Sequence, residues 1–97
     1  MEIAEIRGKE LKKILATGKS SDYPQSTIRW FIKGCTLLKK YSNLNELVKE
    51  RPWMKIKKLK IGENVGLFEM YVTGTWRIKF EVTNDNKIII IDLWDDH

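Results

Sequence analysis

The amino-acid sequence predicts an α+β domain in which helices come first and a meander of strands follows. Before Pro52, apolar residues recur at the three- and four-residue spacing of amphipathic helices. After Pro52, apolar and polar residues alternate, which is the pattern of strands with one buried face. The chain has 97 residues, of which 42% are hydrophobic and four are tryptophan, so we expect a single domain over residues 1–97.

Helical spacing predicts two helices in the first part of the chain, after a short strand that includes Ile3 and Ile6. The apolar face of the first helix consists of Leu11, Ile14 and Leu15. This helix ends at Gly18, because glycine readily adopts the left-handed backbone that closes a helix. The second helix begins near Ser26. Its main apolar face consists of Ile28, Phe31, Ile32, Cys35 and Leu38.

A third, shorter helix is expected between Asn43 and Pro52. Asn43 and Glu46 have the spacing of a capping box, in which two side chains bind the free backbone groups of the first helical turn. Pro52 disfavours a helical conformation in the residue before it, so the helix ends before this proline.

Four stretches after Pro52 are predicted to be strands. In the first, Met54 and Ile56 alternate with lysines. In the next two, the apolar positions are Phe68, Met70 and Val72, and then Trp76, Ile78, Phe80 and Val82. The turns that separate these strands are predicted at Thr73-Gly74 and at residues 83–86. The isoleucines of residues 88–91 predict a last strand that is buried on both faces.

The sequence is basic, with a formal net charge of +5, which favours an anionic partner such as nucleic acid, anionic lipid or an acidic protein. One basic cluster, which no acidic residue interrupts, consists of Arg51, Lys55, Lys57, Lys58 and Lys60. A second cluster consists of Lys9, Lys12, Lys13 and Lys19. The structural alternative for the first cluster is a solvated sheet face whose charges discourage edge pairing.

Composition argues against several classes of function. With one histidine, one cysteine and no CxxC or HExxH spacing, we expect neither a metal site nor another cofactor. Cys35 lies on the main apolar face of its helix, so we interpret it as a buried structural thiol. The chain has no stretch apolar enough to span a membrane, and its first residues lack the signal-peptide pattern. We therefore expect a cytoplasmic protein without a membrane partner.

The remaining polar residues suit a phosphodiester substrate. Arg77, on the clearest predicted strand, can stabilise the charge that develops on a phosphate. His97 titrates near neutral pH and can transfer a proton. The structural alternatives are a cross-strand pair of Arg77 with Glu69 or Asp92, and a frayed chain end at His97. Two tryptophans are assigned to the core rather than to RNA stacking: Trp53 and Trp76.

The segment from Gly66 to Phe80 resembles the family pattern of HigB-type toxins, which belong to the RelE/ParE superfamily. In that pattern a glycine and an aromatic residue precede a strand and a turn, and then come Trp-Arg, an aliphatic residue, one further residue and Phe. Other parts of the chain resemble the family in the same order. These parts are the first helix and its stop (residues 8–18), a Leu-Lys-Gly loop with one extra residue (residues 59–62) and the ending Asp95-Asp96-His97.

The resemblance implies a RelE/ParE-like fold with N-terminal helices packed on a twisted antiparallel sheet. It also implies the toxin of a type II toxin–antitoxin pair, similar to plasmid maintenance killer proteins. Such a toxin is a metal-independent endoribonuclease, an mRNA interferase that cuts mRNA in the ribosome and so inhibits translation. Its expected partners are the ribosome, mRNA and a helix-turn-helix antitoxin of the HigA type.

The resemblance also implies roles for individual residues. Arg77 would stabilise the phosphate, and Asp95 and His97 would form the terminal catalytic pair. The position of a family histidine falls on Lys57 or Lys58, so one of these lysines would replace it in catalysis. The residues assigned to RNA binding are Lys55, Lys60 and Lys79. Asp96 stands where the family has a tyrosine.

Two alternative functions stay open at this point. ParE-type toxins of the same superfamily inhibit DNA gyrase by binding and cleave nothing. A basic RNA-binding module without activity would have the same charge. Ribosome-dependent cleavage of mRNA distinguishes the first function from both alternatives.

Overall fold

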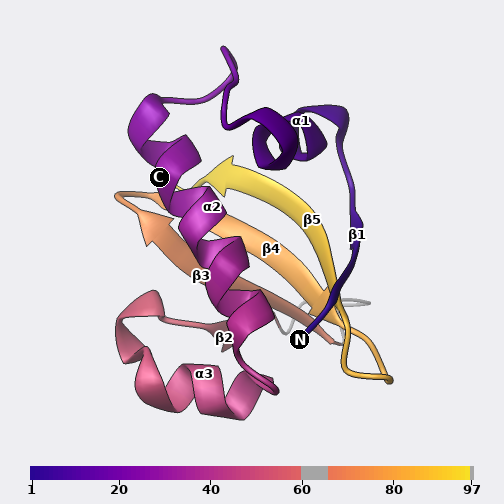
Figure 1. The fold of residues 1–97 in the computed structure, drawn as a ribbon. Coiled ribbons are helices and arrows are strands. Elements are labelled where there is room, and N and C mark those ends of the chain that lie inside the picture. Colours follow the sequence, from indigo (N-terminus) through magenta and orange to yellow (C-terminus); the bar gives the residue numbers. More distant parts are fainter. Residues whose placement is uncertain (60–65, 97) are drawn as a thin grey trace.

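The computed structural model describes residues 1–59 and 66–96 and has the predicted α+β architecture (Figure 1). Within these residues the helices are α1 (Lys9–Thr17), α2 (Gln25–Lys40), α3 (Leu44–Glu50) and a 3₁₀ turn, η1 (Pro52–Met54). The strands are β1 (Ile3–Ile6), β2 (Lys57–Lys58), β3 (Leu67–Thr73), β4 (Trp76–Val82) and β5 (Ile88–Asp95). These strands form a five-stranded sheet in the order β1-β5-β4-β3-β2.

The sheet is mixed rather than wholly antiparallel. Strands β2 to β5 pair with their neighbours in antiparallel fashion, as a meander requires. Strand β1 pairs with β5 in parallel, which corrects the expectation of an antiparallel sheet. Tight turns join β3 to β4 and β4 to β5 and so impose opposite directions on them. No such turn joins β1 to β5, because the helices intervene in the chain.

The predicted ends of the helices are confirmed by their local geometry. Gly18 follows α1 with a φ of 73°, and its N–H donates to the Ile14 carbonyl at 2.7 Å. The Asn43 side chain accepts the Glu46 N–H at 3.0 Å and so caps α3. These ends depend on residues close in sequence, which explains why the pattern alone located them.

The stretch that follows α3 differs from its prediction. Instead of a strand through Met54 and Ile56, residues Pro52–Met54 form the 3₁₀ turn, and Lys55 has a left-handed backbone with a φ of 49°. Proline is well suited to the first position of a helical turn, which explains the change. Met54 is buried, but Trp53 is 42% exposed, so the assignment of Trp53 to the core is wrong.

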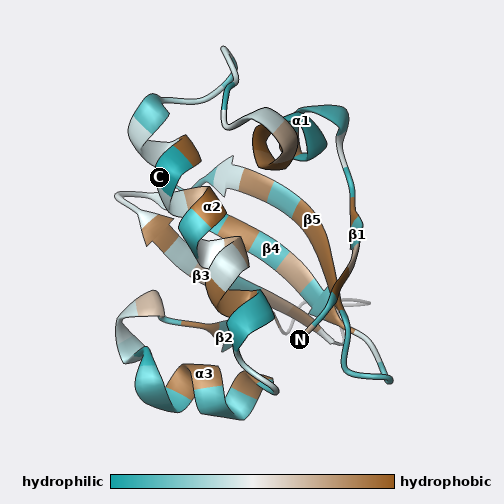
Figure 2. Cartoon of the chain, in the orientation of Figure 1, coloured by the Kyte–Doolittle hydropathy of each residue, from teal (hydrophilic) through white to brown (hydrophobic). Residues whose placement is uncertain are grey.

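Helix α2 crosses one face of the sheet and forms the main core with it (Figure 1). Gly34 lies directly against the sheet, since an added Cβ would lie 2.8 Å from Met70 Cε and 3.1 Å from Ile78 Cδ1. The strands that face α2 alternate in hydropathy, as the banding of β4 shows (Figure 2). Their inward side chains are buried, including Met70, Ile78, Phe80 and Ile90.

Strand β5 is fully buried on one face only. Ile88 and Ile90 are buried, whereas Ile89 and Ile91 are partly exposed. This corrects the prediction of a strand buried on both faces, and the reason is that α2 covers a single face of the sheet. The other face is therefore available for polar side chains.

Candidate functional site

The face of the sheet away from α2 carries cations, aromatic rings and three carboxylates, those of Glu69, Glu81 and Asp92. Met70, Ile78 and Leu93 point toward the helices, so their neighbours along each strand point away from them. The pairing register places these outward residues in rows across the strands. We call this surface the cationic face and define it by Lys57, Glu69, Tyr71, Arg77, Lys79 and Trp94.

Arg77 lies in the middle of one row, between Tyr71 on β3 and Trp94 on β5. Its guanidinium carbon is 5.1 Å from the centroid of the Tyr71 ring. Its Nη1 donates to the carbonyls of Gly74 at 3.3 Å and Trp76 at 3.0 Å. Glu69 and Asp92 are not its cross-strand neighbours, so the interpretation of Arg77 as their partner is wrong.

Lys79 lies in the next row, opposite Glu69 on β3 and Asp92 on β5. Its ammonium is 5.1 Å from the centroid of the Trp94 ring. Within the part of the chain that the structure describes, neither Lys79 nor Arg77 forms an ion pair within 4.0 Å. Their charges are thus available to an anionic ligand.

Glu69 and Lys57 form the charged edge of the cationic face. Lys57 Nζ is 3.0 Å from Glu69 Oε1, and the Glu69 side chain is only 8% exposed. A carboxylate at this depth is stable only with such a partner. Lys57, one of the two lysines expected to replace the family histidine, is therefore engaged in an ion pair with Glu69.

The other lysines of the first basic cluster do not share one surface. Lys58 pairs with Phe68, so it lies on the opposite side of β2 from Lys57, and it is exposed. Lys55 is exposed beside the 3₁₀ turn. Lys60 and the rest of the predicted Leu-Lys-Gly loop after Leu59 lie outside the described residues.

Asp95 does not join Arg77. Asp95 pairs with Trp76, whereas Trp94 pairs with Arg77, and neighbouring residues of a strand point to opposite faces. The Asp95 carboxylate accepts a hydrogen bond from the Thr75 hydroxyl. The register thus places Arg77 and Asp95, two of the predicted catalytic residues, on opposite faces of the sheet. His97, the other predicted catalytic residue at the chain end, lies outside the described residues.

Two residues of the cationic face, Tyr71 and Trp94, were not predicted from the sequence, and Glu69 was considered only as a partner of Arg77. Each occupies a polar or aromatic position in an alternating strand. Such a position by itself indicates a partly exposed side chain and not a functional role. Their proximity to Arg77 and Lys79 depends on the register between strands, which one strand's pattern does not contain.

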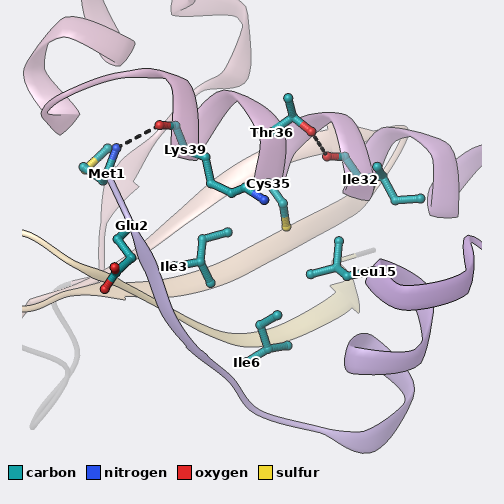
Figure 3. Close-up of a pocket in the computed structure, with 9 residues that line it drawn as sticks. All are labelled: Met1, Glu2, Ile3, Ile6, Leu15, Ile32, Cys35, Thr36 and Lys39. Carbon is teal, nitrogen blue, oxygen red and sulfur yellow. Dashed lines mark hydrogen bonds between the residues drawn. The ribbon is translucent and has the colours of Figure 1, made fainter.

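A separate cavity of about 740 Å³ lies between β1, α1 and α2, on the helix side of the sheet (Figure 3). Its lining is mostly apolar and includes Ile6, Leu15 and Cys35, with Lys39 among the polar residues. Cys35 is 2% exposed, and burial raises the pKa of its thiol to about 12. The burial of Cys35 confirms its interpretation as a buried structural thiol.

The described residues contain no group of three or more histidine, cysteine or acidic side chains that could hold a metal ion. Among the same residues, none of the helices has the length and apolar character needed to cross a membrane. Neither the models of known protein families nor the sequences of curated proteins match this chain.

Proposed function

We propose that the protein is a HigB-like toxin of a type II toxin–antitoxin system that cuts mRNA in the ribosome. The observation that carries this proposal is the cationic face, where Arg77 and Lys79 lie beside aromatic rings and form no ion pair with described residues. Cations and aromatic rings together are the features that nucleic-acid-binding surfaces combine. The protein would act in the cytoplasm, and a helix-turn-helix antitoxin of the HigA type would be its partner.

In the proposed reaction, the 2′-hydroxyl of RNA attacks the neighbouring phosphate and loses its proton to a base. The bond to the 5′-oxygen breaks, and this oxygen takes a proton from an acid. Arg77 would hold the phosphate oxygens and stabilise their growing negative charge, because its guanidinium is fixed before the substrate arrives. His97 is the residue we propose for proton transfer, and Asp95 is left out because of its position on the other face.

The test is the substitution Arg77→Ala. Loss of a group that stabilises the transition state is expected to slow cleavage about a hundredfold or more. Arg77→Lys keeps the charge but not the forked geometry, so it should restore only part of the rate. Arg29→Ala, at an exposed position of α2, removes the same charge and should leave cleavage unchanged. Cleavage sites are mapped by primer extension on mRNA with purified ribosomes, and thermal melting verifies the fold of each variant.

The separation of Arg77 from Asp95 favours a second candidate, an RNA-binding module that inhibits translation without cutting. In that case ribosomes would stall on intact mRNA, and primer extension would show no new 5′ ends. Full cleavage by Arg77→Ala, in contrast, would mean that Arg77 has no part in the reaction, and it would exclude the module that binds without cutting. An open reading frame for a helix-turn-helix protein beside this one would support the toxin–antitoxin assignment.

A further inference from the structure

We propose that the cationic face takes single-stranded RNA whose bases stack on Tyr71 and Trp94, while Arg77 and Lys79 hold the phosphates between them. The proposal rests on the proposed function only in its choice of RNA as the ligand. Beyond that function, it specifies that the bound RNA is single-stranded and that its bases stack on two aromatic side chains.

The first argument is the row that Tyr71, Arg77 and Trp94 form across three neighbouring strands. Adjacent strands lie about 4.8 Å apart, so residues on β3 and β5 are separated by roughly 10 Å. Bases within a duplex are stacked directly on each other at about 3.4 Å per step. Two rings at the wider spacing therefore suit nucleotides that are splayed apart, which only a single strand allows.

The second argument is that the two rings are partly exposed and are already held in place. Tyr71 Oη accepts the Gly74 N–H at 3.1 Å, which fixes the ring above the β3–β4 turn. Trp94 is held between its strand and the Lys79 ammonium, 5.1 Å from its centroid. A rigid aromatic platform loses little conformational freedom when a base stacks on it.

The third argument is energetic. A cation over an exposed ring contributes about 0.5–1 kcal/mol, and a base stacked on such a ring contributes about 1–3 kcal/mol. A bound strand can replace each cation–ring contact with a base–ring contact and move the cation onto a phosphate. Arg77 uses Nη1 for main-chain carbonyls, which leaves its Nε and Nη2 hydrogens for this purpose.

An acidic protein is the competing ligand for such a surface, because it would neutralise the same cations. However, an acidic protein would gain little binding free energy from the two aromatic rings, because they would offer it only ordinary apolar contact. The effect of removing the rings while keeping the charges therefore distinguishes the two ligands.

The experiment measures fluorescence anisotropy with a labelled 12-nucleotide single-stranded RNA and with the duplex of the same sequence, using the full chain. We expect the single strand to bind at least tenfold more tightly than the duplex. Trp94→Leu and Tyr71→Leu should each weaken binding of the single strand about 5- to 150-fold, the equivalent of one stacked base. Trp94→Phe keeps a ring and should lose much less.

Trp53→Leu is the matched control, because Trp53 is exposed but lies on η1, outside the cationic face. It should bind RNA like the unmodified protein. Titration of single-stranded RNA should also quench tryptophan fluorescence, and this quenching should decrease in Trp94→Phe. A purely structural role of Trp94 would not produce that optical change.

Several outcomes would overturn the inference: no detectable binding of single-stranded RNA, equal affinity for the duplex, or normal affinity in both leucine variants. Equal competition by polyglutamate against the parent and both leucine variants would assign the face to an acidic protein instead. Ring-dependent binding without ribosomal cleavage would refute the endoribonuclease and keep the inference. Cleavage that persists in both leucine variants, with unchanged affinity for RNA, would refute the inference and keep the endoribonuclease.

Discussion

Glu69 is a buried carboxylate on the cationic face. Its side chain is 8% exposed, and its ion-pair partner is Lys57 at 3.0 Å. Lys79 is its cross-strand neighbour on β4 but lies over the Trp94 ring. Lys57 is consequently engaged in an ion pair within the sheet, so its substitution is expected to affect the fold as well as any bound ligand.

This arrangement predicts that Lys57→Ala lowers the stability of the fold as well as RNA affinity. Exposed ion pairs contribute at most about 1 kcal/mol, whereas breaking a fully buried pair costs about 3–5 kcal/mol. Because Glu69 is buried and Lys57 is 69% exposed, we expect an intermediate loss of about 1–3 kcal/mol. Urea denaturation measures it.

A double-mutant cycle provides the control for this residue pair. Glu69→Gln removes the buried charge, so adding Lys57→Ala to it should cost less than Lys57→Ala alone. Equal costs in the two backgrounds would mean that the pair is not coupled. Lys58→Ala, on the other side of β2, should leave stability within about 0.5 kcal/mol.

Helix α3 is an element that local interactions define almost completely. It has seven residues, too few to be stable alone, so its cap and its one buried anchor, Leu47, determine whether it forms. Asn43 accepts the Glu46 N–H, and Ser42 Oγ donates to Glu46 Oε2 at 3.0 Å. A residue that precedes the helix thus fixes where it begins.

Asn43→Ala is predicted to destabilise the protein by about 0.5–2 kcal/mol, because the first turn of α3 loses its side-chain acceptor. Asn45→Ala is the matched control, since Asn45 is exposed within the same helix and alanine has the higher helix propensity. Its stability should be unchanged or slightly higher. If both alanine variants unfold at the same urea concentration, the cap contributes nothing.

The elements differ in how far the sequence could predict them. The ends of α1 and α3 follow from Gly18 and Asn43, which act within a few residues. The alternation of β4 also located its buried positions Ile78 and Phe80, and Arg77 between Trp76 and Ile78 accordingly points away from the core. The pairing of β5 with β4 depends on distant residues and contains a register shift between Lys79 and Phe80. No local sequence pattern indicates that register shift. The shift nevertheless helps to determine which side chains of β5 lie opposite Arg77.

At the scale of the whole molecule, the sheet separates two chemically different environments. One face packs against α2, and its side chains are apolar and buried. The other is the cationic face. A residue's sequence distance from Arg77 therefore matters less than the face to which it points. The family resemblance placed Arg77 and the chain end in one catalytic site, but it contains no information on the faces of the sheet. Asp95 and Trp94 are neighbours in sequence, yet their side chains point to opposite faces.

The division between faces predicts the outcome of Asp95→Ala. Its carboxylate accepts a hydrogen bond from Thr75 across the end of β4 and β5, where the Asp96 N–H also donates to the Thr75 carbonyl at 2.8 Å. Loss of the carboxylate should cost about 0.5–1.5 kcal/mol of stability. RNA affinity should stay within about twofold, a change of only a few tenths of a kcal/mol, because the register directs Asp95 to the face opposite Arg77.

Thr75→Val separates this structural role from a catalytic one, because it removes the same hydrogen bond and leaves the carboxylate in place. If Asp95 supports only the end of the sheet, the two variants should cleave mRNA at similar rates. If Asp95 takes part in the reaction, Asp95→Ala should lose cleavage while Thr75→Val retains it. That second result would mean that the ribosome-bound protein brings Asp95 to the substrate from the face opposite Arg77, and that the free structure does not present the assembled site.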